Sequence, residues 1–134
     1  MGWRAVAFSL LTLGLILGCG KNAEQSRNRI SGKATFEGKP IPYGEVLFTP
    51  DGTKKNSGAQ GIAPLRDGVF DTAAVGGKGY GGGPAVIRVT GLTGAGGKLL
   101  CEYEFQVDLP LGETTHDLDV PAKGKAKGPT TPEI

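Results

Sequence analysis

The chain has 134 residues, which is long enough for one small domain and too short for two. Its 15 Lys and Arg residues nearly balance its 13 Asp and Glu residues. This balance provides no broad basic field, so a nucleic-acid partner is not expected. The 24 Gly and 9 Pro residues argue against long helices.

The N-terminal segment has the layout of a secretory signal. Residues 5–17 are almost entirely apolar and follow the basic residue Arg4. This run is shorter than the roughly 20 residues that a membrane-spanning helix requires, so a permanent span is not expected. The small residue Gly18 ends the run at the expected cleavage point.

The cysteine after this point indicates more than secretion. The sequence Ile16-Leu17-Gly18-Cys19 resembles the lipobox of bacterial lipoprotein signal peptides. The resemblance implies that the chain is exported, cut before Cys19 and held on a membrane of the cell envelope by lipid on that cysteine. The anchored domain would then face the periplasm or the cell exterior. The alternative is ordinary secretion with cleavage near Gly18 and no lipid.

Composition divides the chain into four segments. Residues 1–18 form the signal, and residues 19–28 form a polar tether without periodicity. Residues 29–121 carry the strand patterns of a domain. Residues 122–134, rich in Lys, Gly and Pro, are expected to form a disordered tail.

The domain opens with two strand patterns separated by a turn. In residues 30–36, apolar or small side chains alternate with polar ones, which is the period of a half-buried strand. Residues 37–42 hold the Gly and Pro of a turn. Residues 44–50 then predict a strand with Val46 and Phe48 on one side.

A hairpin and a further strand come next, after a polar loop. Residues 60–66 and 69–72 predict two shorter strands joined across Asp67-Gly68, a dipeptide that favours a tight turn. Residues 84–91 follow a loop of small residues and predict another strand.

The clearest strand pattern lies near the end of the domain. Its apolar side chains alternate with polar ones that must face solvent. The apolar members are Cys101, Tyr103, Phe105, Val107 and Leu109, and the polar members are Glu102, Glu104, Gln106 and Asp108. Residues 114–120 close the domain. The sequence therefore predicts an all-β fold, a seven-stranded antiparallel β-sandwich.

The first strands carry a family resemblance. The stretch ISGKATFEGKPIPYGEVLF, from Ile30 to Phe48, resembles the opening of a carboxypeptidase regulatory-like, transthyretin-like domain. The downstream stretches that extend the likeness are Gln60-Gly61-Ile62-Ala63-Pro64, Gly82-Gly83-Pro84 and Val107-Asp108-Leu109-Pro110. Over about residues 28–121 the chain is similar to small lipoproteins of planctomycete-type bacteria. The resemblance implies a transthyretin-like or immunoglobulin-like sandwich with a mostly non-enzymatic, accessory role, and it identifies no ligand.

Two patterns raise the question of a nucleotide site or a catalytic pair. The loop Gly77-Lys78-Gly79-Tyr80-Gly81-Gly82 satisfies G-x-G-x-x-G, but a strand follows it where a dinucleotide-binding fold has a helix. A role in backbone conformation is favoured. His116, the only histidine, and Cys101 have no ligand-spaced neighbours. A histidine at the rim of the core and a buried thiol are favoured over catalysis by the two.

The acidic residues raise the question of a calcium site. The candidates lack the spacing of a known calcium loop and are better explained as turn and surface residues; they are Asp51, Asp67, Asp71, Asp117 and Asp119. Glu102 and Glu104 are interpreted as part of a solvated strand face. An acid–base pair needs surroundings that give its two carboxyl groups different pKa values, and the sequence indicates no such surroundings here.

Cys19 is therefore the one site residue predicted, as the point of lipid attachment, and no catalytic, cofactor-binding or metal site is predicted. The expected protein is a lipid-anchored, non-enzymatic envelope lipoprotein with an accessory or interaction role. Its partners would be the membrane, through the anchor, and an envelope protein or glycan. The alternative is binding of a small ligand, glycan or metal through the loops at one end of the sandwich.

Overall fold

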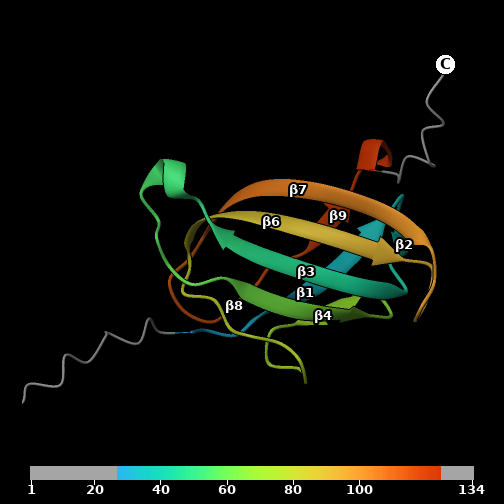
Figure 1. The fold of residues 1–134 in the computed structure, drawn as a ribbon, viewed down its shortest axis with the longest axis horizontal. Coiled ribbons are helices and arrows are strands. Elements are labelled where there is room, and N and C mark those ends of the chain that lie inside the picture. The colour runs from blue at the N-terminus through green and yellow to red at the C-terminus, as the bar shows by residue number, and fades with distance from the viewer. Residues whose placement is uncertain (1–26, 125–134) are drawn as a thin grey trace, which may run out of the picture.

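The computed structural model describes residues 27–124, and Figure 1 shows that this part consists of strands and short 3₁₀ turns. The all-β prediction is confirmed. The strands are β1 (Ile30–Phe36), β2 (Lys39–Pro40), β3 (Tyr43–Pro50), β4 (Gly61–Arg66), β5 (Val69–Asp71), β6 (Gly83–Leu92), β7 (Leu99–Leu109), β8 (Thr114–Thr115) and β9 (Leu118–Val120). The 3₁₀ turns are η1 (Gly52–Lys54) and η2 (Ala122–Gly124). Cys19, with the predicted signal, lies outside the described residues.

Hydrogen bonds join the strands into one sheet, which curls around the core (Figure 1). The order is β2-β1-β5-β4-β3-β6-β7, and β8 and β9 pair with β1. Ser31 of β1 lies opposite Asp71 of β5 on one side and opposite Thr115 of β8 on the other. The curled sheet therefore begins with β8 and β9 and ends with β7.

Both β8 and β9 run parallel to β1, whereas all the other pairs are antiparallel as expected. The chain leaves β7 and crosses to the far side of β1 before it pairs again, so the last strands do not form a hairpin. Between β8 and β9, the backbone N–H of His116 donates to the carbonyl of Ser31 at 2.8 Å. A Cβ at Gly32 would lie 2.2 Å from the carbonyl oxygen of His116, so this crossing requires glycine in β1.

The two tight turns use the residues that the sequence indicated. Asp67 and Gly68, between β4 and β5, have φ of 50° and 79°, and Glu37 and Gly38, between β1 and β2, have φ of 51° and 77°. Positive φ at both central residues is the geometry of a type I′ hairpin turn, which matches the twist of the strands it joins.

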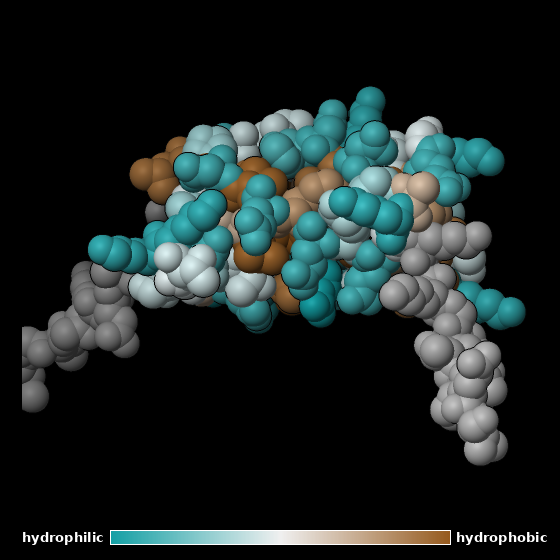
Figure 2. Space-filling model, turned by 90° about the horizontal axis from the view of Figure 1, so that it is seen from above, coloured by the Kyte–Doolittle hydropathy of each residue, from teal (hydrophilic) through white to brown (hydrophobic). Residues whose placement is uncertain are grey.

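The expected alternation is confirmed in β1, β3, β4 and β6, where buried residues alternate with more exposed ones. In β7 it holds only in part. Its outward row is exposed as expected, and Cys101 and Leu109 are buried, but Tyr103, Phe105 and Val107 between them are only half-buried. Figure 2 views the side of the molecule on which β7 lies and shows hydrophobic atoms among hydrophilic side chains there.

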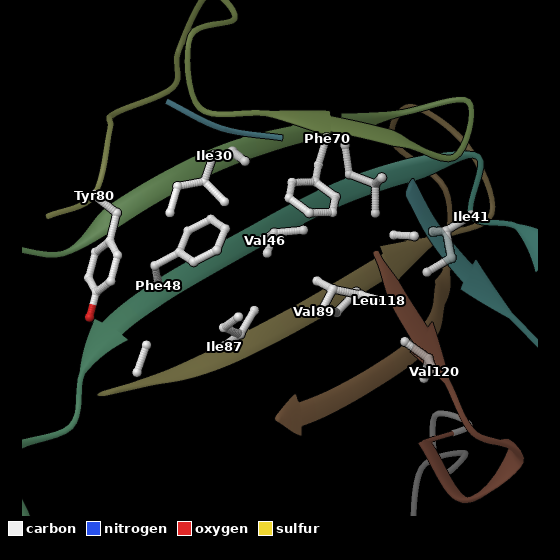
Figure 3. Packing of buried hydrophobic residues seen from close by; sticks show 14 of the residues in the cluster. Ile30, Ile41, Val46, Phe48, Phe70, Tyr80, Ile87, Val89, Leu118 and Val120 are labelled. Atoms are coloured by element: carbon white, nitrogen blue, oxygen red, sulfur yellow. The ribbon is translucent and has the colours of Figure 1, made fainter. Parts of the chain in front are cut away.

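The core lies inside the curl, where side chains from β1, β3, β6 and β9 point toward one another (Figure 3). Aromatic contacts link its centre, because the Phe48 ring lies 6.2 Å from that of Phe70 and 5.7 Å from that of Tyr80, centroid to centroid. Such pairs contribute about 0.5–1.5 kcal/mol beyond the area they bury. Tyr80 comes from the glycine-rich loop, so this loop supplies part of the core.

Candidate functional site

Cys101 and His116, considered above as a catalytic pair, lie at opposite ends of the sheet order, on β7 and in the segment between β8 and β9. Cys101 is fully buried on β7, and burial raises the pKa of its thiol. His116 lies between β8 and β9, half-exposed and held through its backbone. A buried thiol with a raised pKa forms little thiolate, the nucleophilic form, at neutral pH.

The glycine-rich loop is tied to the domain at two points. Lys78 forms an antiparallel bridge with Ile62, and Tyr80 forms one with Asn28. The amide of Asn56 lies 3.3 Å from the hydroxyl of Tyr80, and burial raises the pKa of that hydroxyl. The strand β6 follows the loop at Gly83, so the G-x-G-x-x-G pattern has no helix N-terminus behind it to bind a phosphate.

The aspartates considered for calcium do not gather into one cluster in the described residues, and four of them have protein partners. Asp51 accepts from the hydroxyl and the N–H of Thr53, and the hydroxyl is the larger cause that lowers its pKa. The other partners are Arg29 for Asp71, the Lys33 N–H for Asp117 and the Thr35 hydroxyl for Asp119. Within residues 27–124, no three His, Cys, Asp or Glu side chains lie close enough together to hold a metal ion.

The acidic row of β7 faces a single arginine on the neighbouring strand. Arg88 of β6 donates to Glu104 with Nη2 and Oε1 2.7 Å apart, and its Nε lies 3.9 Å from Glu102. Asp108 lies on the same outward face, nearer the end of the strand. The outward row of β7 thus carries three carboxylates beside one guanidinium, and Arg88 was not singled out from the sequence.

The inward row of β7 forms an incompletely covered apolar strip of Tyr103, Phe105 and Val107. The Tyr103 and Phe105 rings meet edge to face with centroids 4.8 Å apart. Lys123 of η2 places its ammonium 5.4 Å from the Tyr103 centroid, a cation–π contact. We use the name β7 edge for three features of this strand together. They are the apolar strip on its inward face, the carboxylates of Glu102, Glu104 and Asp108 on its outward face, and the side of its backbone that pairs with no described strand.

Two hollows lie elsewhere on the described surface. An open groove of about 470 Å³ on the outer face of β3, β4 and β6 includes Tyr43, Glu45, Arg66 and Thr90 in its lining, and the Arg66 guanidinium stacks 3.7 Å from the Tyr43 centroid. A smaller hollow of about 220 Å³ lies beside Asn56 and Tyr80 at the loop end. The smaller one is below the roughly 300 Å³ at which ligand pockets begin.

Comparison of the chain with protein-family models and with curated proteins gives no match. Across residues 27–124 the structure contains no helix with the length and apolar character needed to cross a membrane.

Proposed function

We propose that this chain is a bacterial envelope lipoprotein, anchored by lipid on Cys19, whose domain is non-enzymatic and binds an envelope protein or glycan. The anchor rests on the Ile16-Leu17-Gly18-Cys19 resemblance and on the short apolar run before it. A single acyl chain holds a protein only marginally, and the lipoprotein resemblance implies more than one.

We assign the domain to the transthyretin-like sandwich class on the stretch from Ile30 to Phe48. The curled sheet of strands supports the all-β part of that assignment. Domains of this class are mostly accessory modules, which favours an interaction role over catalysis.

The observation that carries the interaction role is the β7 edge. It combines eleven residues of edge strand with a half-buried apolar strip and an acidic row. Edge strands usually avoid this combination, because unpaired backbone groups beside apolar side chains recruit other chains. A surface of this kind suits a protein partner.

A second candidate function is binding of a small ligand, and the groove of about 470 Å³ on the outer sheet face favours it. Its size falls within the range of ligand pockets, and Arg66, Glu45 and Thr90 supply polar groups. This groove lies on the sheet and not at the loop end where the alternative was expected.

Photo-crosslinking in intact cells distinguishes the two functions. A photoreactive residue at Gln106, exposed on β7, should crosslink an envelope component, whereas one at Glu45 in the groove should not. Lys54 of η1 is the matched exposed control site. Equal crosslinking from Gln106 and Lys54, or none from either, would contradict the interaction role.

A further inference from the structure

We propose that the β7 edge binds an extended segment of a partner protein in which basic side chains alternate with apolar ones. The segment would add one strand to the sheet. This inference rests on the proposed interaction role and specifies the chemistry of the partner.

Within residues 27–124, one side of the β7 backbone has no strand partner, and η2 lies against that strand at Glu102 and Tyr103. β6 pairs with β7 along its whole length, from Gly83 opposite Leu109 to Leu92 opposite Leu99. No other described strand pairs with β7. An extended peptide that binds there gains main-chain hydrogen bonds from the row of N–H and C=O groups, as in other cases of strand addition.

The outward row sets the charge of the partner. Glu102, Glu104 and Asp108 point to the outer face, and Arg88 on the β6 side offsets one of these charges. On the other side of β7, a new strand would place the Cβ atoms of its outward residues about 4.5–5.5 Å from the Cβ atoms of these acidic residues. Lys or Arg at alternate positions of the partner would therefore be favoured over neutral or acidic side chains.

The inward row sets the other face of the partner. Tyr103, Phe105 and Val107 are half-buried against the rim of the core. Apolar side chains on the inner face of an added strand would cover them and remove apolar area from water. The contact of Lys123 with Tyr103 shows that a cation is also accommodated at the start of this strip.

A second copy of the chain is a poor occupant, because its own β7 has the wrong charges. In an antiparallel β7 pair centred on Phe105, Glu102 would lie opposite Asp108 at two places. A pair centred on Glu104 would set the two Glu104 carboxylates opposite each other. Like charges directly opposite destabilise a strand pair, so the acidic row disfavours self-association and favours a basic partner.

The test uses the full-length processed protein in detergent and the synthetic peptide Lys-Val-Lys-Val-Lys-Val, labelled for fluorescence anisotropy. Three peptides serve as controls: one with Glu in place of Lys, one with the same residues in the block order Lys-Lys-Lys-Val-Val-Val, and one with alternate backbone nitrogens methylated. We expect saturable binding of the first peptide and binding about tenfold or more weaker for each control. Equal binding of the block or methylated peptide would overturn strand addition.

Protein variants locate the binding. Glu102→Gln with Glu104→Gln should weaken binding about tenfold, whereas Glu37→Gln with Glu113→Gln removes the same charge from exposed positions outside β7 and the groove and should leave binding unchanged. Both double variants are checked for folding by thermal unfolding. If the two double variants weaken binding equally, the peptide is held by general electrostatic attraction, and the proposed binding site on β7 is wrong.

Three other outcomes are informative. If the peptide binds only to the variant with Lys125→Ala and Lys127→Ala, the chain's own tail is the occupant of the β7 edge. This outcome would contradict the proposal that a separate partner protein binds there. Crosslinking from Gln106 in cells without any affinity for the peptide would overturn the partner chemistry and leave the interaction role standing. Affinity for the peptide without crosslinking from Gln106 in cells would contradict the interaction role and leave the binding chemistry of the β7 edge standing.

Discussion

The guanidinium of Arg29 donates to the carboxylate of Asp71, with Nη2 and Oδ2 2.6 Å apart, and so joins the residue before β1 to the last residue of β5. Nε of Arg29 donates to the same carboxylate, which also accepts from the backbone N–H of Ala73. The hydrogen bond from Arg29 is the largest of the effects that lower the pKa of Asp71.

This relationship predicts a loss of stability in acid. Because the pKa of Asp71 is lower in the folded chain than in the unfolded chain, its contribution is fully present above the unfolded value of about 3.9. It is lost as the pH falls through the folded value. In urea unfolding, the stability difference between wild type and Asp71→Asn should be constant above about pH 5 and shrink below about pH 4. In an Arg29→Gln background this pH dependence should be weaker, and an unchanged dependence would contradict the role of Arg29.

The half-burial of Phe105 predicts a graded effect of truncation. Phe48→Ala removes a fully buried ring and should cost about 3–5 kcal/mol of unfolding free energy, whereas Phe105→Ala should cost about half as much. Chemical denaturation of the two variants measures the difference. Equal losses would show that Phe105 is as fully enclosed in solution as Phe48.

The crossing at Gly32 predicts a sharp requirement for glycine. Gly32→Ala would place a methyl group against the carbonyl of His116 and should cost about 1–3 kcal/mol, because β1 or the β8–β9 segment must move. Gly52→Ala is the matched control, since no heavy atom lies within 4 Å of the added methyl group. Thermal unfolding of both variants tests the prediction, which a stable Gly32→Ala protein would contradict.

The proposed anchor predicts a specific defect of Cys19→Ser. Without the thiol no lipid is attached, and the lipoprotein peptidase implied by the resemblance acts only on the lipidated form. Wild type should incorporate labelled fatty acid and enter the detergent phase, whereas the variant should do neither and accumulate uncleaved. Wild-type protein without label and soluble outside the membrane would show an ordinary secretory signal.

Local patterns predicted the strands well, because alternation and turn residues act over a few positions. Residues 30–36 were predicted as a strand and form β1, and Asp67-Gly68 forms the predicted turn. The parallel pairing of β8 and β9 with β1 depends on where the chain crosses after β7, and no local signal specifies this.

The same limit applies to the candidate site. The alternation from Cys101 to Leu109 predicted which side chains face inward, but their degree of burial depends on whether another strand covers them. The ion pairs of Arg88 with Glu102 and Glu104 required the register of β6 on β7, which is set by contacts far apart in sequence. The dispersal of the aspartates likewise became visible only with the whole sheet in place.

The pairing of β1 with β9 has a consequence for the order in which the chain folds. Ala34 lies opposite Leu118, and the nearby bond from the Lys33 N–H to Asp117 spans 84 residues. Closing so long a loop delays the contact, and sheets built on such pairings fold slowly. β1 can pair with β2 and β5 as soon as those strands have been synthesised, but its parallel pairing with β9 must wait for Val120. The first strand of the domain is therefore completed on both sides only when the last strand is present.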